Sequence, residues 1–336
     1  MNQRRQTMFF ANPVCLQGWA SVVGPDEDQG PMQGEFDYVI PDYLWGEKSW
    51  EKTEGKMLQE AVLRAVALAD CSLDTVDLML AGDLLNQTIT SNYTAGELKI
   101  PLAGLYGACS TMAEGLALGG ALISGNFCNR VVCATSSHHL TAERQYRFPT
   151  EQGVQRPLTA QWTATASGAI VLGKERPTPL RLTCATLGQV IDSGQSDAND
   201  MGGAMAPAAA HTLLTHLTQT GRQPEFYDLI ITGDLGKFGL ELMRRLCQKE
   251  GLTLGENCTD CGILLYHPRQ DVHAGGSGCG CSASVFAGPI IKKMMKGNLA
   301  RVLLIGTGAL MSPASLQQGG TIPAVAHAVA VERVDL

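Results

Sequence analysis

The stretch with the clearest chemical potential is YGACST at residues 106–111. Its small residues leave room for a sharp turn, and Ser110 and Thr111 are of types that commonly start a helix. Cys109 is therefore predicted at or just before a helix N-terminus, where free amides and the positive end of the helix dipole lower the pKa of a thiol. The same place suits a bound anion such as a carboxylate. The stretch predicts either a nucleophilic cysteine or an anion-binding site.

Cys109 also has a plain structural interpretation, since free cysteines are often small buried residues. Two aspartates, Asp83 and Asp234, each stand in a Gly-Asp-Leu triplet that follows an apolar run. Aspartate at such a junction commonly caps a turn or a helix. If either carboxylate faced a ligand, it would need a cation or a protonated ring nitrogen beside it. The sequence leaves both interpretations open.

Histidines and arginines follow the apolar run at 130–135. His138 comes at the end of this predicted strand, where ligand contacts gather in α/β sheets, and its imidazole could donate to a carboxylate. Arg144, Arg147 and Arg156 offer bidentate contacts to carboxylates. The alternatives are a histidine satisfied within its loop, and arginines on a solvated surface or on a face that meets a partner subunit.

The pairs Cys258-x-x-Cys261 and Cys279-x-Cys281 could supply the four thiolates of a zinc site. However, Cys281 is the counterpart of Cys109 in an internal repeat, which places it in a packed helix start. We therefore predict no metal site, and no cofactor apart from calcium that enters together with a ligand.

Composition narrows the class of protein. The net charge of −7 and the absence of a Lys/Arg block argue against nucleic acid as a partner. No apolar run approaches the roughly 18 residues of a membrane span, and no signal-like region precedes Pro13. The 11 cysteines are scattered through apolar segments, as in proteins of a reducing compartment. We expect a soluble intracellular α/β protein.

Hydrophobic periodicity predicts short buried strands alternating with helices. We expect helices over residues 47–69 and 112–125, and a long loop or lid over 139–163. Residues 1–45 are rich in Gly, Pro and Asp and are predicted to be irregular, with a strand at 19–23. The other predicted strands are 76–81, the segment after Pro101, 130–135, 164–172 and 180–190.

The second half of the chain repeats the first. The Asp-Leu and Gly-Asp-Leu pattern at 77–84 recurs at 228–235, and the Cys-Ser pair at 109–110 recurs at 281–282. Each Cys-Ser pair is followed by a Gly-Asn pair and then by Arg-Val at the start of the next apolar run. A repeat this long predicts two fused α/β halves rather than a solenoid. The second half has an extra piece at 251–278, which we interpret as a hairpin around its His-Pro pair.

Two strand-helix halves, each with a buried helix that starts near a Cys-Ser turn, resemble the thiolase superfamily of condensing enzymes. In that superfamily a cysteine at the tip of the first buried helix forms an acyl-enzyme, and Cys109 matches it. The segment 278–285 resembles the glycine-flanked loop and partner helix of the second half. The resemblance implies an α/β, thiolase-like fold of two pseudo-symmetric halves, 1–175 and 176–336, with mixed five-stranded sheets around buried central helices.

Five motifs carry a closer resemblance: GDLLNQ at 82–87, GACST at 107–111, TSSHHLTAERQYRFPTE at 135–151, DMGGAMAPAAA at 200–210 and AGGSGCGCSA at 274–283. In combination they resemble the stage V sporulation protein AD family over essentially the whole chain. That thiolase-like family implies a soluble subunit of a spore membrane assembly that handles dipicolinic acid, which is pyridine-2,6-dicarboxylate.

The chain departs from the condensing enzymes at two positions. Those enzymes use their cysteine with two further polar groups, typically His-His or His-Asn, which stabilise an enolate and a thioester oxyanion. Here Asp234 stands at the first position and Cys279 at the second. An anionic carboxylate opposes a developing enolate electrostatically. The departure argues against Claisen condensation, and acyl transfer by Cys109 remains an alternative.

We expect a non-catalytic protein that binds dipicolinic acid, either free or as its calcium chelate, and takes part in moving it during sporulation. The expected partners are membrane-embedded sporulation channel proteins and a second copy of the chain, paired through the sheet edge of the first half. The expected location is the periphery of the forespore or spore inner membrane. The alternatives are an acyltransferase with Cys109 as its nucleophile and a structural adaptor with a vestigial pocket. The predicted ligand-binding residues are Asp83, Cys109, Ser110, Thr111, His138, Arg144, Arg147, Asp234 and Cys279.

Overall fold

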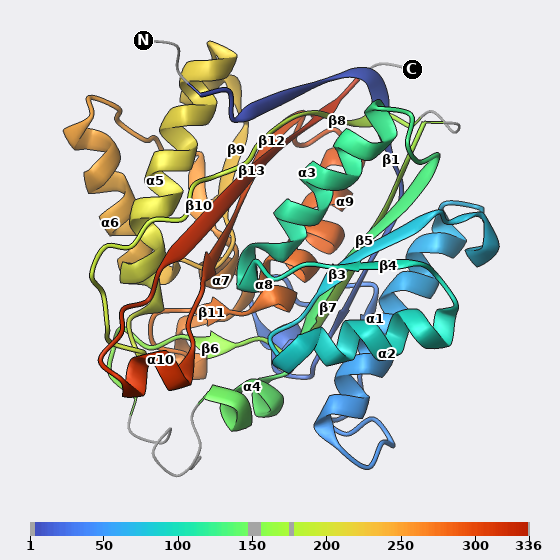
Figure 1. The fold of residues 1–336 in the computed structure, drawn as a ribbon, viewed down its shortest axis with the longest axis horizontal. Helices are drawn as coiled ribbons and strands as arrows, with labels where there is room; N and C mark the ends of the chain where they lie inside the picture. The colour runs from blue at the N-terminus through green and yellow to red at the C-terminus, as the bar shows by residue number, and fades with distance from the viewer. Residues whose placement is uncertain (1–3, 147–155, 175–177, 335–336) are drawn as a thin grey trace.

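The centre of the fold is a mixed sheet built from two sets of strands (Figure 1). This computed structural model describes residues 4–146, 156–174 and 178–334. In spatial order, the first set is β4 (Leu102–Gly104), β3 (Leu78–Gly82), β5 (Arg130–Ser137), β7 (Ala166–Gly173) and β1 (Thr7–Val23). The second set is β10 (Cys258–Asp260), β9 (Leu229–Thr232), β12 (Arg301–Ala309), β13 (Ala324–Arg333) and β8 (Leu180–Thr186).

The two sets have the same topology. In each, three neighbouring strands are parallel, and the remaining two pair antiparallel. Strands β1 and β8, each the last strand of its set, also pair antiparallel and so join both sets into one sheet. Equivalent aspartates make equivalent bonds: Asp77 accepts from the amides of Asn129 and Arg130, and Asp228 accepts from those of Ala300 and Arg301. The thiolase-like fold and its internal duplication are therefore confirmed.

Strand β1 is longer than predicted. The sequence placed a strand only at 19–23 and an irregular chain before it, whereas β1 begins at Thr7. Residues 15–23 pair with β7, and residues 7–9 and 14–15 pair with β8, with a break in register between Phe9 and Val14. The missed part, residues 8–13, is half-buried or exposed and contains Asn12 and Pro13, which are uncommon in strands, so its strand pattern is weak. The short β2 (Tyr38–Val39) adds to β1 in parallel.

Two buried helical elements occupy the centre of the molecule. Helix α3 (Thr111–Ser124) contacts strands of both sets, including β1, β5, β12 and β13, and confirms the predicted buried helix. Its counterpart consists of α8 (Cys279–Val285), a π-helical segment over Phe286–Ile290 and α9 (Ile291–Met295). Pro289 lies in the π-helical segment. Because proline lacks an amide proton and crowds the preceding turn, it accounts for this local widening.

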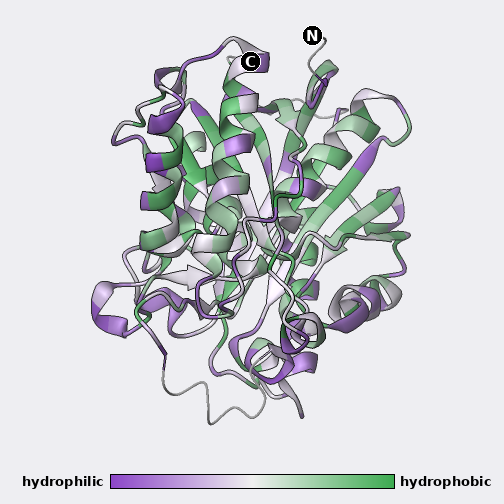
Figure 2. Cartoon of the chain, turned by 60° about the vertical axis from the view of Figure 1, so that its left-hand side comes forward, coloured by the Kyte–Doolittle hydropathy of each residue, from purple (hydrophilic) through white to green (hydrophobic). Residues whose placement is uncertain are grey.

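The outer helices cover the two sets separately (Figure 1). Helices α1 (Trp50–Leu68) and α2 (Ile89–Leu98) cover the first, and α5 (Met201–Thr220) and α6 (Gly236–Lys249) cover the second. Figure 2 shows hydrophobic residues concentrated on the strands and hydrophilic residues along outer loops and helices. None of the described helices has both the length and the apolar character needed to cross a bilayer.

Short helices also occur in the described loops. They are η1 (Glu27–Gln29), η2 (Leu73–Thr75), η3 (Asn86–Thr88), η4 (Ala108–Ser110), η6 (Pro224–Phe226), η7 (Pro268–Gln270) and α10 (Pro313–Gln317).

Two predicted loops contain regular structure. The predicted lid begins with helix α4 (His139–Tyr146) and ends with β6 (Trp162–Thr163), which pairs with β11 (Gly276–Ser277). The predicted hairpin around His267 is wrong, because α7 (Cys261–Leu265) forms in its place. Asp260 causes this by accepting the amide of Ile263 and capping the turn. The predicted hairpin took the short apolar run of this segment for a strand. Periodicity alone cannot distinguish a strand from a helix in so short a run.

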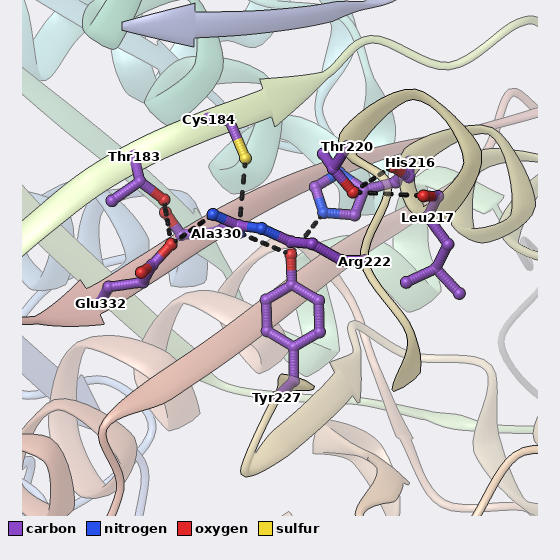
Figure 3. A network of polar contacts seen from close by, with 9 residues as sticks. All are labelled: Thr183, Cys184, His216, Leu217, Thr220, Arg222, Tyr227, Ala330 and Glu332. Carbon is purple, nitrogen blue, oxygen red and sulfur yellow. Dashed lines mark hydrogen bonds and ion pairs between the residues drawn. The ribbon is translucent and has the colours of Figure 1, made fainter. Parts of the chain in front are cut away.

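A buried polar network ties α5 to the sheet of the second half (Figure 3). The His216 Nε2 atom lies 2.6 Å from the Tyr227 hydroxyl, which also accepts from Arg222 at 3.0 Å. Arg222 donates in turn to Glu332 on β13 at 2.8 Å. Burial lowers the pKa of His216 to about 3, so its imidazole is neutral and its role in the network is structural.

Candidate functional site

The candidate site is built around a strained turn that presents Cys109. Ala108 has a left-handed φ of 50°, which costs a residue with a Cβ about 1–2 kcal/mol. Strand β12 lies against this turn: a Cβ on Gly308 would stand 2.1 Å from the carbonyl oxygen of Gly107. The glycine therefore allows the close approach that holds the turn in place.

Ser110 and Thr111 hold the turn from inside. The Ser110 hydroxyl donates to the Gly107 carbonyl at 2.7 Å, and the Thr111 hydroxyl donates to the Ala108 carbonyl at 2.6 Å. Both side chains are buried, and neither lines the pocket beside Cys109. The predicted helix start is confirmed, but these hydroxyls bond to the preceding turn instead of capping helix amides.

A pocket with a volume of about 80 Å³ opens beside Cys109. It lies where α4, α5 and the β6–β11 pair meet the Cys109 turn. Its apolar lining is Leu84, Ala108, Ala142, Ala198, Met201, Met205, Ala309 and Met311. Its polar lining is Cys109, Glu143, Tyr146, Gln161, Thr163, Asn199 and Ser277. This lining, taken over the described residues, contains no lysine, arginine or histidine.

Cys279 and Asp234 are the groups that meet the Cys109 thiol. The thiol lies within hydrogen-bonding reach of both the Cys279 thiol and the Asp234 carboxyl. Cys279 also donates to the Ala108 carbonyl at 3.0 Å. Asp234 and Cys279 are the two positions at which the sequence departs from the condensing enzymes. Both meet Cys109, although Asp234 belongs to a loop after β9 and Cys279 to the start of α8.

Three neutral hydrogen-bond donors hold the Asp234 carboxyl. Oδ1 accepts from the Thr307 hydroxyl at 2.7 Å, and Oδ2 accepts from the Ser277 hydroxyl at 2.8 Å and the Gly278 amide at 3.1 Å. Burial nevertheless raises the pKa of Asp234, and the hydrogen bonds oppose this rise. The carboxyl is fully buried and orders the loop ahead of α8.

The pKa of Cys109 is raised, contrary to the prediction from its place at a helix start. The contact with the Cys279 thiol, burial and the negative charge of Asp234 together lift the pKa well above the ordinary value of a thiol. A helix dipole acts with a fraction of a unit charge. The Cys279 thiol, burial and the Asp234 carboxyl together outweigh it, and Cys109 is therefore a protonated thiol at neutral pH.

Asp83 and His138 serve the scaffold. Asp83 accepts from the amides of Leu85 and Ser91, both at 2.9 Å, and caps the turn that leads into α2. His138 accepts from the Leu140 amide at Nδ1, so Nε2 carries the proton and donates to the Tyr43 carbonyl at 2.9 Å. Burial lowers the pKa of His138 to about 4. Neither residue lines the pocket.

The predicted arginines have other partners. Arg144 pairs with Glu51 and lies over the ring of Trp50. Arg156 donates to the Asp271 carbonyl at 2.9 Å, and its guanidinium lies over the ring of Trp162. Arg147 lies outside the described residues.

The pocket contains residues that the sequence did not single out. Ala142, Glu143 and Tyr146 share one side of α4, at helical spacings of three and four residues. Treating 139–163 as a loop hid that spacing. Met201 and Met205 are likewise four residues apart on α5. A helical interpretation of residues 139–146 would have grouped the pocket residues of α4.

The described ranges contain no group of three or more His, Cys, Asp or Glu side chains arranged to hold a metal ion. Cys258 and Cys261 are buried free thiols, as are Cys279 and Cys281.

Comparisons with solved structures show the fold. The chain is similar to 3-oxoacyl-[acyl-carrier-protein] synthase III from Aquifex aeolicus VF5, with a TM-score of 0.59 and 12% identity over 95% of this chain and 99% of that one. It is also similar to cerulenin-bound OleA from Xanthomonas campestris, with a TM-score of 0.62 and 13% identity over 98% of this chain and 100% of that one. At this identity, the likeness concerns architecture alone.

Comparisons of sequence are more specific. The family described as Stage V sporulation protein AD (SpoVAD) matches residues 4–332. The Stage V sporulation protein AD of Bacillus subtilis (strain 168) is 45% identical over 329 residues, which cover 98% of this chain and 97% of that protein. This chain therefore belongs to the stage V sporulation protein AD family.

Proposed function

We propose that this chain acts in sporulation as a non-catalytic binder of dipicolinic acid, using the pocket beside Cys109. Family membership supports the role in sporulation. The observation that carries the binding proposal is the pair of groups facing Cys109, a carboxyl and a second thiol. Neither can stabilise the anion that forms during condensation, because a carboxylate repels it and a thiol is a weak donor.

The acyltransferase alternative has less support. A thiol reacts as its thiolate, and the raised pKa of Cys109 keeps the thiolate scarce. In the described ranges no imidazole lines the pocket to take the thiol proton. Binding does not need either feature, since the pocket offers apolar contact area together with neutral hydrogen-bonding groups.

The charge of the pocket favours the calcium chelate over the free dianion. Glu143 is the ionisable carboxyl in the described lining, accompanied by the neutral groups of Gln161, Thr163 and Asn199. A dianion would have no positive side chain to offset its charge in this lining. Calcium held between the two carboxylates neutralises the ligand and prefers oxygen ligands of the kinds that Glu143 and Asn199 carry.

Isothermal calorimetry on the full chain tests the binder. We expect dipicolinate to bind more tightly with calcium than with a chelator of calcium, and a mono-carboxylate such as picolinate to bind weakly. Glu143→Gln should remove most of the calcium effect, and Glu60→Gln, at the α1 surface, serves as the control. Absence of dipicolinate binding with and without calcium would contradict the proposal.

Intact-mass measurement after incubation with acyl-thioesters tests the acyltransferase alternative, because an acyltransferase would leave an adduct on Cys109.

We also propose that the chain forms a homodimer through the edge of β4. This strand ends the sheet path, and the exposed Tyr93 on α2 and Tyr106 after β4 lie beside it. Light scattering should report a dimer, and the double substitution Tyr93→Glu with Tyr106→Glu should give monomers. Phe127→Glu changes an equally exposed aromatic in the loop after α3 and should leave the dimer intact.

The proposed wider partners are membrane-embedded sporulation channel proteins at the forespore or spore inner membrane. Membership in the family supports this proposal. Co-purification of membrane proteins with a tagged chain from sporulating cells tests it. Recovery of the chain from the soluble fraction alone, without membrane partners, would contradict it.

A further inference from the structure

Cys109 and Cys279 are joined in space by the packing of the two halves. Cys109 lies on η4 in the first half, and Cys279 begins α8 in the second. Their thiols lie within hydrogen-bonding reach of each other, and Cys279 Sγ is 3.0 Å from the carbonyl oxygen of Ala108, next to Cys109. Hydrogen bonds from Thr135 to the Cys279 carbonyl and from the Gly280 amide to Ser137 hold the start of α8 in this position.

Only one of the two thiols faces the pocket. Cys109 is part of the lining, whereas the side chain of Cys279 is completely buried behind it. A small oxidant that enters the pocket therefore reaches Cys109 first, and Cys279 is already in place to resolve the product. A thiol in a pocket wall with a resolving thiol beside it is one feature of redox-active cysteine pairs.

We propose that Cys109 and Cys279 form a reversible disulfide across the floor of the pocket. This inference goes beyond ligand binding, since it concerns the chemistry of the thiol pair. None of the other nine cysteines lines the pocket. The structure holds the pair as two free thiols, the reduced form of this bond.

The oxidant is hydrogen peroxide, and the reaction has two steps. The sulfur of Cys109 attacks the peroxide O–O bond, which breaks to give a Cys109 sulfenic acid, and the thiol proton leaves with the displaced oxygen as water. The Cys279 sulfur then attacks the sulfenic sulfur, the S–O bond breaks, and the Cys279 proton leaves with that oxygen as a second water. Two thiols and one peroxide thus give one disulfide and two waters. The raised pKa of Cys109 makes the first step slow at neutral pH, and the raised pKa of Cys279 slows the second.

Peptide mapping of the full chain tests the proposal. The protein is treated with excess hydrogen peroxide, blocked with N-ethylmaleimide and digested without a reductant. We expect a linked peptide pair containing Cys109 and Cys279, lost after treatment with dithiothreitol. Cys279→Ser should abolish the link and leave Cys109 as sulfenic or sulfinic acid. Cys133→Ser replaces a buried thiol outside the pocket and should leave the link unchanged. Oxidation of Cys109 to sulfinic acid in the unsubstituted chain, without the link, would overturn the proposal.

The consequence for the pocket rests on the proposed function. A disulfide fixes the Cys109 side chain against α8 and away from the ligand, so we expect dipicolinate affinity to fall on oxidation by up to about tenfold, the same limit as for removal of the sulfur, and to recover with dithiothreitol. Unchanged affinity in the cross-linked chain would overturn this consequence. If the reduced chain binds no dipicolinate, the proposed function fails, and the linked peptide still decides whether the disulfide forms.

Discussion

At the residue scale, Asp234 determines what the site can do. In condensing enzymes this position carries a polar group that stabilises an anion. Here the Asp234 carboxyl is a hydrogen-bond acceptor, and it already accepts from Thr307, Ser277 and the Gly278 amide. Its charge also keeps the Cys109 proton in place. The equivalent aspartate of the first half, Asp83, caps a turn instead. Of this duplicated pair, the second copy is the one that reaches the cysteine.

The first residue-scale prediction concerns Cys109→Ala. A bound ligand meets Cys109 as one part of a larger lining, so removing its sulfur should change the affinity for dipicolinate by less than about tenfold, or about 1.4 kcal/mol. Calorimetry on the two proteins measures this. A complete loss of binding in a folded variant would mean that the sulfur itself holds the ligand.

The second concerns Asp234→Asn, which removes the negative charge near the thiol and should lower the pKa of Cys109. We expect alkylation of Cys109 by iodoacetamide at neutral pH to speed up by about tenfold, as a shift of about one pKa unit gives. Mass spectrometry of the Cys109 peptide over time provides the rate. Asp260→Asn changes an equally buried carboxyl that does not contact Cys109, and should leave this rate unchanged. Equal rates in all three proteins would show that Asp234 does not control the thiol.

At the scale of elements, strand β12 and the Cys109 turn form one unit. Gly306 and Gly308 on β12 face the turn, and a Cβ at either would stand within 3 Å of its atoms. The left-handed Ala108 is kept in its strained conformation by this packing. The position of the thiol therefore depends on a strand that is about 200 residues away in the chain, as the numbering of Cys109 and Gly308 shows.

Gly308→Ala tests that dependence. Its Cβ would meet the Gly107 carbonyl at 2.1 Å, so the turn must move, and we expect a loss of about 1–3 kcal/mol in the free energy of unfolding together with weaker dipicolinate binding. Gly96→Ala is the matched control, because a Cβ there meets nothing within 4 Å on helix α2. It should stabilise by about 0.5–1 kcal/mol. Urea unfolding measures both, and equal stabilities for the two variants would contradict the packing argument.

At the scale of the whole molecule, several acids among the described residues are buried and bonded to neutral hydrogen-bond donors. Glu27 on η1 accepts from the Thr165 amide at 2.9 Å and from the Tyr266 hydroxyl, and so links the first-half loop to α7 of the second half. Its other carboxylate oxygen has no partner among the described residues. Burial raises the pKa of Glu27 from 4.5 to about 7, against the effect of these hydrogen bonds.

This shift predicts how stability depends on pH. Below about 4.5 Glu27 is protonated in both states, and between about 4.5 and 7 the folded state binds more protons than the unfolded state. The free energy of unfolding should therefore fall as pH rises through this window, by about 3 kcal/mol for a shift of this size. Glu27→Gln should reduce the slope in this window by about that amount, and the rest of the slope should remain because burial also raises the pKa values of Glu54 and Asp260. The surface substitution Glu60→Gln is the control, and a profile that Glu27→Gln leaves unchanged would contradict the assignment.

The sequence predicted much of the framework and less of the site. The buried helix after Cys109, the internal repeat and the strands at 76–81 and 130–135 were readable because they are local patterns or direct matches within the chain. The long β1, the helix α4 and the turn at α7 were not. The missed part of β1 contains Asn12 and Pro13, α4 lies in a polar stretch that resembles a loop, and one capping contact from Asp260 decided α7. Pocket residues such as Glu143 were missed together with α4.

The sequence by itself determined the two-fold architecture and the presence of an acid and a thiol where a catalyst needs polar partners. It could do so because the repeat and the motifs are properties of residue order. Only the tertiary structure decided that Asp234 and Cys279 contact Cys109, and that they raise the pKa of the thiol that a helix end alone would lower. The physical reason is that electrostatic effects at a buried group depend on distance in space, and packing of the two halves sets that distance.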